Sequence, residues 1–304
     1  MSSNIEQVSW GGWPNCYRLA NSEIELILTA DVGPRVIRCG FVGGPNVFKE
    51  YAEELGGMGE ATWKIRGGHR VWVAPERANI TYELDNYPVA ITVQGDTVAA
   101  TSPVDSRTGL QKTLILRLNG CHITVTNRLT NTTLFPIGCA AWGPTAMAPG
   151  GLGLTGFPPR GTHPEDLEPV NPLVMWSYTD FSDPRWRFTS KYVTLRQDPH
   201  AKAAQKLGLF NPHTFGAYLL DGHLFLKQFH PDPAKTYADM GCSYQSFTNC
   251  DMLELETMGP YEFVAPGRHT EFTETWSLHR GVVLPEITDA ALDAILLPRL
   301  SAPY

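Results

Sequence analysis

The sequence lacks several features that would define whole classes of protein. Its six cysteines are scattered, and none forms a CxxC pair or the Cys/His spacing of a zinc site. It has no run of lysine or arginine and a net charge of −7, so nucleic acids and anionic membranes are not expected partners. No apolar stretch approaches the roughly 18 residues of a membrane-spanning helix. We therefore expect a soluble protein without a metal or other cofactor.

The compartment and the domain organisation are predicted on similar grounds. The opening segment MSSNIEQVSWGGW has neither the basic start nor the apolar core of a secretion signal. Scattered cysteines are typical of small buried residues in a reducing compartment, so we expect a cytoplasmic protein. The sequence contains no linker or repeat that would divide its 304 residues, which favours one domain over residues 1–304.

Short strands dominate the hydrophobic pattern. Eight runs rich in Val, Ile, Thr and aromatic residues cover residues 23–28, 89–93, 111–118, 122–129, 214–220, 224–229, 252–256 and 270–278. Asn119-Gly120 and Asp221-Gly222 each join two of these runs, as in tight hairpin turns. Helical periodicity is limited to residues 50–55, 201–206 and 286–297. This pattern predicts an all-β sandwich with a few short helices.

The segment from residue 144 to residue 199 differs from the rest. It is rich in Pro, Gly, Trp and Asp, and strand alternation fades within it. Long irregular segments in compact domains are usually functional or disordered, and the aromatic content argues against disorder. We expect an ordered excursion over one face of the sheets that brings Trp142, Trp176 or Trp186 close to a bound ligand.

A pair of carboxylates is predicted near the C-terminus. In the segment DMLELETMG, alternation places Met252, Glu254 and Glu256 on one face of a strand, and Leu253 and Leu255 on the other. Neighbouring carboxylates in a partly desolvated groove raise one pKa toward neutrality, which suits a general base or acid. The alternative is a solvated strand face without a catalytic role.

The segment IRGGHRVWVAPE, residues 65–76, concentrates groups that bind sugars. Its two glycines permit a close backbone turn. The side chains around this turn are Arg66, His69, Arg70, Trp72 and Glu76. Arginine donates paired hydrogen bonds to vicinal hydroxyls or carboxylates, and tryptophan stacks on the apolar side of a pyranose. The alternative is a β-turn in which Arg70 pairs with Glu76 and Trp72 belongs to the core.

The order of four motifs along nearly the whole chain resembles that of the galactose mutarotase-like superfamily. The motifs are DVGPR at 31–35, IRGG at 65–68, NRLTNTT at 127–133 and ELET at 254–257. IRGG resembles the segment that supplies an arginine to the sugar site of hexose-6-phosphate mutarotases. NRLTNTT resembles the strand and turn before the acid histidine of aldose 1-epimerases. The segments GGHRVWVAPE, DPRW and LELETMGP resemble a bacterial branch of the superfamily. The resemblance implies a β-supersandwich that recognises a small carbohydrate.

The resemblance also implies a catalytic base on a late strand, which is written LETQ or similar in mutarotases. Glu256 matches the glutamate of LET, whereas Glu254 matches it if Glu256 takes the place of the glutamine. We favour Glu254 and keep Glu256 as the alternative. We also expect Arg66, His69 and Arg70 to converge with these two glutamates on one concave face.

The chain departs from the family pattern at the general acid. Aligning PIGCAAWG with the stretch that carries the acid histidine places Trp142 at that position. Mutarotation needs a base for the anomeric hydroxyl and an acid for the ring oxygen, so another group must replace the histidine. The candidates for the acid are His69, His163 and Lys227. A surface-loop role is the alternative for each histidine. Further candidates for sugar contacts are Arg160, Tyr237 and Asp239, and a turn with a local hydrogen bond explains Tyr237 and Asp239 equally well.

Three functions follow from these observations. The first is an aldose 1-epimerase-like mutarotase that needs no cofactor. The second is a non-catalytic sugar-binding sensor, in which the missing acid reflects lost chemistry. The third is a glycoside hydrolase or lyase on the same fold, which the expected cytoplasmic location disfavours. The sequence leaves the sugar, its anomer and the oligomeric state open.

Overall fold

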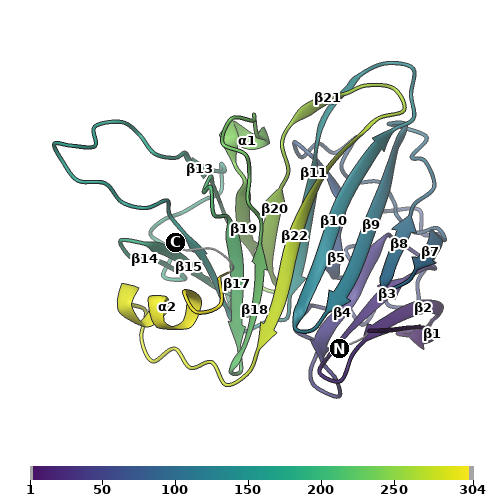
Figure 1. Cartoon of the computed structure of the whole chain (residues 1–304), viewed down its shortest axis with the longest axis horizontal. Coiled ribbons are helices and arrows are strands. Elements are labelled where there is room, and N and C mark those ends of the chain that lie inside the picture. The colour runs from purple at the N-terminus through teal and green to yellow at the C-terminus, as the bar shows by residue number, and fades with distance from the viewer. Residues whose placement is uncertain (1–2, 301–304) are drawn as a thin grey trace.

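A computed structural model describes residues 3–300 of the chain, and two large antiparallel sheets dominate it (Figure 1). The first sheet has the order β1-β2-β3-β4-β5-β11-β20-β19-β16-β13, and β6 and β21 also pair with β11. Its strands are β1 (Asn4–Trp10), β2 (Trp13–Ala20), β3 (Ile24–Thr29), β4 (Arg35–Phe41), β5 (Gly68–Arg70), β6 (Trp72–Ala74), β11 (Ile137–Met147), β13 (Leu173–Met175), β16 (Gln205–Leu209), β19 (Tyr244–Thr248), β20 (Leu253–Met258) and β21 (Glu262–Val264).

The second sheet has the order β14-β15-β12-β17-β18-β22-β10-β9-β8-β7. Its strands are β7 (Ala90–Gln94), β8 (Thr97–Thr101), β9 (Leu110–Asn119), β10 (His122–Asn131), β12 (Leu152–Gly156), β14 (Trp186–Phe188), β15 (Tyr192–Arg196), β17 (Phe215–Leu220), β18 (His223–Gln228) and β22 (His269–His279). Each of the eight predicted strands overlaps one of the strands in the structure. The prediction of an all-β sandwich is therefore confirmed.

The main hydrophobic core lies between the two sheets. Leu253 and Leu255 of the first sheet pack in one cluster with Leu116 and Val125 of the second sheet. The Trp276 ring meets Phe48 and Phe225 edge to face, with ring centroids 5.6 Å apart in both pairs. Burying each such large apolar side chain stabilises the fold by about 1.5–3 kcal/mol.

The two predicted hairpins are confirmed, with a different turn position in one of them. Asp221 and Gly222 form the two-residue turn between β17 and β18, with φ angles of 49° and 75°, the left-handed pair that a type I′ turn requires. Between β9 and β10, Asn119 pairs with His122, so the turn comprises Gly120 and Cys121. The glycine has a φ of 59° and supplies the left-handed residue.

Helices are few and short. The predicted helix over residues 286–297 is present as α2 (Asp289–Leu296), which begins after the capping hydroxyl of Thr288. It packs Leu292 and Leu296 against Leu154 and Phe215 of the second sheet. The other helical element, α1 (Ala238–Gly241), is a single irregular turn. Within residues 3–300, neither element has the length and apolar content that crossing a membrane would take.

Two predicted helices were wrong. Residues 50–55 form isolated turns, because the backbone there is engaged by the IRGG segment: Glu50 bridges Gly67, and the Tyr51 amide donates to the Arg66 carbonyl at 3.2 Å. Residues 201–206 lead into β16, whose register with β19 pairs Gln205 with Thr248. In both cases long-range strand pairing overrides a weak local helical pattern.

The segment between residues 144 and 199 contains more regular structure than predicted. It includes the end of β11 and the strands β12, β13, β14 and β15. Its longest irregular part, residues 157–172, forms an exposed loop that extends away from the sheets at the left of Figure 1. The expectation of an excursion over a sheet face was therefore wrong for this part of the segment.

Candidate functional site

A cavity of about 420 Å³ opens over the first sheet, on the face opposite the core. Five charged residues line it: Arg70, Glu76, Lys206, Glu254 and Glu256. Six aromatic residues complete most of its wall: Trp63, Trp72, Tyr82, Trp142, Tyr178 and Phe247. Aromatic walls with a few convergent polar groups are typical of small-molecule sites.

The two carboxylates come from alternate positions of β20. Leu253 and Leu255 point into the core, so Glu254 and Glu256 share the opposite face. This is the arrangement that the ELE pattern predicts. Both glutamates are buried, and Glu256 is only 1% exposed, so neither lies on a solvated strand face.

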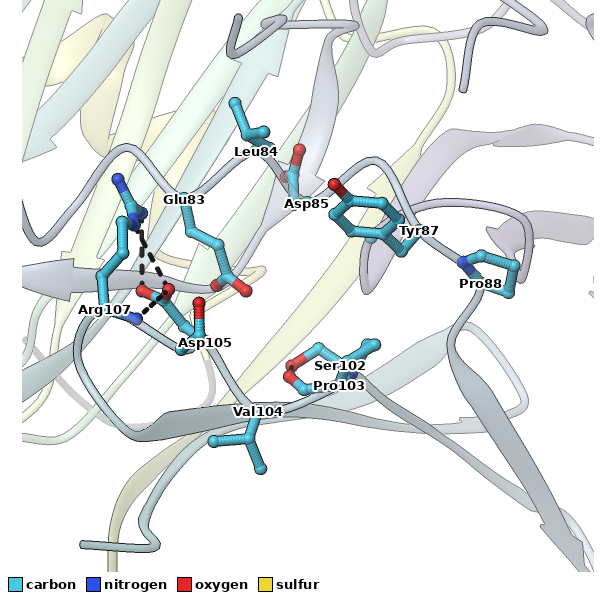
Figure 2. A pocket seen from close by; sticks show the side chains of 12 residues that line it. Glu83, Leu84, Asp85, Tyr87, Pro88, Ser102, Pro103, Val104, Asp105 and Arg107 are labelled. Atoms are coloured by element: carbon cyan, nitrogen blue, oxygen red, sulfur yellow. Dashed lines mark hydrogen bonds and ion pairs between the residues drawn. The ribbon is translucent and has the colours of Figure 1, made fainter. Parts of the chain in front are cut away.

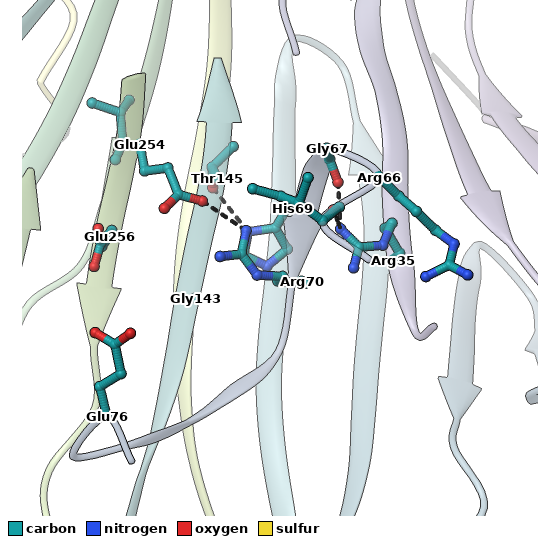
Figure 3. A network of polar contacts seen from close by, with 12 residues as sticks. Arg35, Arg66, Gly67, His69, Arg70, Glu76, Gly143, Thr145, Glu254 and Glu256 are labelled. Atoms are coloured by element: carbon teal, nitrogen blue, oxygen red, sulfur yellow. Dashed lines mark hydrogen bonds and ion pairs between the residues drawn. The ribbon is translucent and has the colours of Figure 1, made fainter. Parts of the chain in front are cut away.

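Arg70 brings the IRGG segment into contact with β20. Its Nη1 donates to Glu254 Oε1 at 2.7 Å, across 184 positions of sequence, and both side chains are buried. Figure 3 shows the guanidinium of Arg70 directed toward Glu254. The Arg70 guanidinium also stacks 3.8 Å from the centre of the Trp72 ring, a geometry that favours a cation–π interaction. Arg70 therefore pairs with Glu254 and not with Glu76.

The two glycines make this contact possible. Gly67 and Gly68 have φ angles of 95° and 68°. A Cβ on Gly68 would lie 2.2 Å from the Val36 carbonyl oxygen, and one on Gly67 would lie 1.9 Å from the Lys49 carbonyl oxygen. Only glycine combines the left-handed conformation with this close approach. The turn thus seats β5 between β4 and β11, with Arg70 facing the cavity.

Lys206 and Glu256 form a second buried pair. Lys206 Nζ donates to Glu256 Oε2 at 3.1 Å and lies 3.8 Å from Glu76 Oε2. Burial raises the pKa of Glu256 to about 7, because lost hydration outweighs the attraction of the Lys206 ammonium, and Glu254 adds to the rise. Burial alone would lower the pKa of Lys206, but Glu256 and Glu76 outweigh it and raise that pKa above its ordinary value. A carboxyl that titrates near neutrality can exchange protons at physiological pH.

Trp142 occupies the position where the resemblance expects a histidine. Its ring is buried, contacts the Trp72 ring at a centroid distance of 5.2 Å, and lies 4.9 Å from Lys206 Nζ. The same Nζ lies 4.9 Å from the ring of Trp176. The ammonium of Lys206 therefore lies beside Trp142, which the resemblance aligns with the acid histidine of aldose 1-epimerases.

His69 and Lys227, two of the predicted acids, lie on the core side of the first sheet. His69 is fully buried, with Nδ1 2.9 Å from Thr145 Oγ1 and Nε2 2.9 Å from Asn127 Oδ1 (Figure 3 draws His69 and Thr145). Burial, followed by the charge of Lys227, holds the pKa of His69 well below its ordinary value. Lys227 Nζ donates to the Gly143 carbonyl at 2.8 Å and pairs with Glu274 at 3.3 Å. The sheet separates both side chains from the cavity.

Arg66 also lies away from the two glutamates. It has a φ of 51°, and its guanidinium is 2.6 Å from Glu60 and 3.6 Å from Asp85. In Figure 3 the Arg66 side chain lies on the side of Arg35 that is away from Glu254 and Glu256. Of the three residues expected to converge with Glu254 and Glu256, the structure brings only Arg70 to them. The alternation of β5 explains the position of His69, because His69 and Arg70 are consecutive and face opposite sides. Arg66 precedes β5 and lies in the turn before it.

The remaining predicted residues lie outside the cavity lining. His163 is exposed in the loop of residues 157–172, and Arg160 lines a separate cavity with Lys191. Tyr237 is buried, and its hydroxyl donates to the Asp232 carbonyl at 3.2 Å. Asp239 Oδ2 accepts a hydrogen bond from Gln245 Nε2 at 2.6 Å.

Trp186, also expected near a ligand, instead packs in the main core and donates through Nε1 to Gln205 Oε1 at 3.1 Å. Its side chain is buried there.

Among the cavity-lining residues that the sequence reasoning missed are Lys206, Trp63, Tyr82 and Tyr178. Alternation along QKLGL would have placed Lys206 opposite the buried Leu207 and Leu209, had the segment been interpreted as a strand. The three aromatic residues lie in loops, where periodicity gives no signal.

A larger cavity, of about 620 Å³, lies between two loops of residues 83–88 and 102–107 (Figure 2). Its charged groups are engaged in holding the fold. Asp85 pairs with Arg35 at 2.9 Å, and Glu83 pairs with Lys112 at 2.8 Å. Asp105 accepts from the Arg107 amide at 3.0 Å, within its own turn. The smaller cavity over β20 is therefore the better candidate.

Comparisons with known proteins identify the fold. No family model and no curated protein matches the sequence. Among solved structures, the Slr1438 protein from Synechocystis sp. PCC 6803 aligns with a TM-score of 0.59 at 13% identity, over 90% of this chain and 99% of that one. A Klebsiella pneumoniae protein provisionally described as an aldose 1-epimerase gives 0.58 at 14%, over 95% and 85%. A galactose mutarotase-like protein from Lactobacillus casei gives 0.54 at 11%, over 87% and 100%. The chain thus has the galactose mutarotase-like fold.

Proposed function

We propose that this protein binds an aldose in the cavity over β20 and interconverts its anomers by acid–base catalysis. The observation that carries the proposal is the Glu256–Lys206 pair, a buried carboxyl with a pKa near 7 beside a buried ammonium in an aromatic cavity. The fold similarity to mutarotase-like proteins supports the same conclusion by analogy.

Glu256 is the proposed base. Its Oε2 is engaged by Lys206, whereas its Oε1 is buried and has no hydrogen-bond partner within residues 3–300. We assign this oxygen to the proton transfer with a bound sugar. The ionised carboxyl would take the proton from the anomeric hydroxyl while the bond between C1 and the ring oxygen breaks. Glu254, the other candidate, is held by Arg70 at 2.7 Å. We assign the Arg70–Glu254 pair to binding sugar hydroxyls, since it presents donors and acceptors side by side.

Lys206 is the proposed acid. The two oxygens that exchange protons in mutarotation are both bonded to C1, so the acid and the base must lie close together. Lys206 Nζ meets this requirement at 3.1 Å from Glu256. It would donate a proton to the ring oxygen as that oxygen leaves C1, which gives the open-chain aldehyde. Rotation about the C1–C2 bond and reversal of both transfers yield the other anomer and restore both side chains.

The test is NMR exchange spectroscopy between the α and β anomeric protons of a panel of aldoses. We expect the wild type to accelerate exchange for at least one aldose. Glu256→Gln should reduce that acceleration by roughly two orders of magnitude or more. Glu271→Gln is the matched control, because Glu271 lies on β22, outside the cavity lining, where it pairs with Arg128.

Each outcome of this test has a definite meaning. Binding of an aldose without accelerated exchange would replace the mutarotase proposal by that of a sugar sensor. Acceleration that survives Glu256→Gln would remove Glu256 from the role of base.

A further inference from the structure

Gln245 is a direct cross-strand neighbour of the proposed base. In the antiparallel register of β19 and β20 it lies directly opposite Glu256. The two side chains therefore share one face, with their Cβ atoms about 4.5–5.5 Å apart. Gln245 is fully buried, so its polar atoms need partners inside the protein.

The amide of Gln245 has a fixed orientation. Its Nε2 donates to Asp239 Oδ2 at 2.6 Å. An ionised carboxylate only accepts hydrogen bonds, so the NH₂ group must face Asp239 and the carbonyl oxygen must point elsewhere. Within residues 3–300, Gln245 Oε1 and Glu256 Oε1 both have no hydrogen-bond partner. Two acceptor oxygens on directly opposed residues repel each other where they meet, unless one carries a proton and donates to the other.

Asp239 is held in place by an unusual turn. Asp239 and Met240 have φ angles of 50° and 62°, and Gly241 continues the left-handed path at 95°. The Cys242 thiol donates to the Asp239 carbonyl at 3.1 Å. Two consecutive non-glycine residues in this region cost free energy, and such conformations persist where the surroundings hold them. The turn directs the Asp239 carboxylate to Gln245.

We propose that Asp239 and Gln245 are positioning residues for Glu256. Asp239 fixes the amide so that the Gln245 carbonyl oxygen faces the free oxygen of the Glu256 carboxyl. When Glu256 is protonated, its carboxyl donates a hydrogen bond to the Gln245 carbonyl oxygen. A hydrogen bond to the protonated form, and a repelling lone pair beside the ionised form, both make Glu256 a stronger base. The inference rests on the proposed function only in giving Glu256 a catalytic role.

Several other groups act on the ionisation of Glu256 and must stay constant in the test. They are Lys206 on β16, Glu254 on β20, Glu76 after β6, Tyr178 in the cavity lining, Lys227 on the core side, Cys242 and Tyr244. Arg70 on β5 faces the same cavity. A variant at position 239 leaves all of them in place.

The experiment follows the carboxyl carbon of Glu256 by ¹³C NMR as the pH is changed, in protein labelled at glutamate and without any sugar. Glu256→Gln identifies the signal by its loss. We expect Asp239→Gly to lower the titration midpoint by about one pH unit, because the released amide can turn its NH₂ group toward the carboxylate. Glycine also accepts the left-handed backbone of the turn, which favours folding.

Asp239→Asn is the matched control, since it removes the charge but keeps an oxygen that can accept from Gln245. Its midpoint should shift by less than half as much as that of Asp239→Gly. Equal shifts in the two variants would mean that Asp239 acts only through its charge, and would overturn the proposal. So would a midpoint in Asp239→Gly that matches the wild type.

A second measurement needs no variant at position 239. The ¹⁵N signal of the Gln245 side-chain amide, identified by its loss in Gln245→Met, should change with pH at the same midpoint as the Glu256 carboxyl. An amide signal that ignores this titration would contradict the proposal. Because no sugar is present, failure here leaves the mutarotase proposal intact, and absence of anomer exchange leaves this coupling testable.

Discussion

Lys206 and Glu256 form an ion pair that crosses an intervening strand. Lys206 on β16 extends its Nζ over β19 and donates to Glu256 Oε2 on β20 at 3.1 Å. Both side chains are almost fully buried, and the second oxygen of Glu256 has no hydrogen-bond partner within residues 3–300. The pair places a proton donor and a proton acceptor side by side at the wall of the cavity.

Replacing Lys206 by methionine should have two effects on anomer exchange. The rate should fall by about 10²–10⁴-fold through loss of the acid. The pH at which the remaining activity is half-maximal should rise above about 7, because the ammonium lowers the pKa of Glu256 and the base must be ionised to act. Lys206→Arg, which keeps the charge, should leave the midpoint near that of the wild type. The measurement is kcat/KM against pH, and an unreduced plateau at high pH in Lys206→Met would remove Lys206 as the acid.

The Arg70–Glu254 pair should show strong coupling in stability measurements. Both side chains are buried, so Arg70→Met or Glu254→Leu alone leaves an unpaired buried charge and should cost about 3–5 kcal/mol. The double variant should cost less than the sum of the single ones, with a coupling of about 0.5–3 kcal/mol. Denaturant unfolding of the wild type, the two single variants and the double variant measures this coupling free energy. Additive losses would mean that the ion pair is not formed.

His69 should affect stability at acidic pH and leave the chemistry almost unchanged. Its folded-state pKa lies well below the ordinary 6.5, so the unfolded chain takes up a proton on this residue first. The contribution of neutral His69 to the free energy of unfolding is fully present above pH 6.5 and is lost as the pH falls below that value. His69→Gln should lack this part of the acid dependence in unfolding experiments. A folded His69→Gln protein that has lost anomer exchange at pH 8 would contradict the separation of His69 from the cavity.

Gly68→Ala should disturb both the fold and the site. The substitution places a methyl group 2.2 Å from the Val36 carbonyl oxygen in a left-handed conformation, which should cost roughly 2–5 kcal/mol. Gly95→Ala is the matched control. Gly95 has a similar φ of 61° with no atom within 4 Å of the added Cβ, so only about 1–2 kcal/mol should be lost. Thermal unfolding measures the difference, and equal losses would mean that β5 does not need this close approach.

Local alternation was sufficient to predict the carboxylate face of β20. The ELE pattern placed Glu254 and Glu256 on one side, and the structure has them there. The same rule applied to β5 would have separated His69 from Arg70. Grouping residues 65–76 by their closeness in sequence concealed this, because neighbours in a strand face opposite ways.

Residues whose position depends on long-range pairing could not be predicted. Lys206 lies in a segment with a weak helical pattern, and only its pairing with β19 makes it a strand residue that faces the cavity. The order β5-β11-β20-β19-β16 brings together strands from four separate parts of the chain. No local pattern encodes that order, because each strand would fit equally well beside other partners.

The most direct test of the account is a crystal structure of the Glu256→Gln variant with an aldose that the protein binds. We predict one sugar in the cavity over β20, with its anomeric oxygen about 2.6–3.2 Å from the side chain at position 256 and its ring oxygen within the same distance of Lys206 Nζ. A sugar hydroxyl that contacts the Arg70–Glu254 pair should lie on the side of the sugar ring away from C1. A sugar bound elsewhere, or one whose anomeric carbon points away from both residues, would contradict the account.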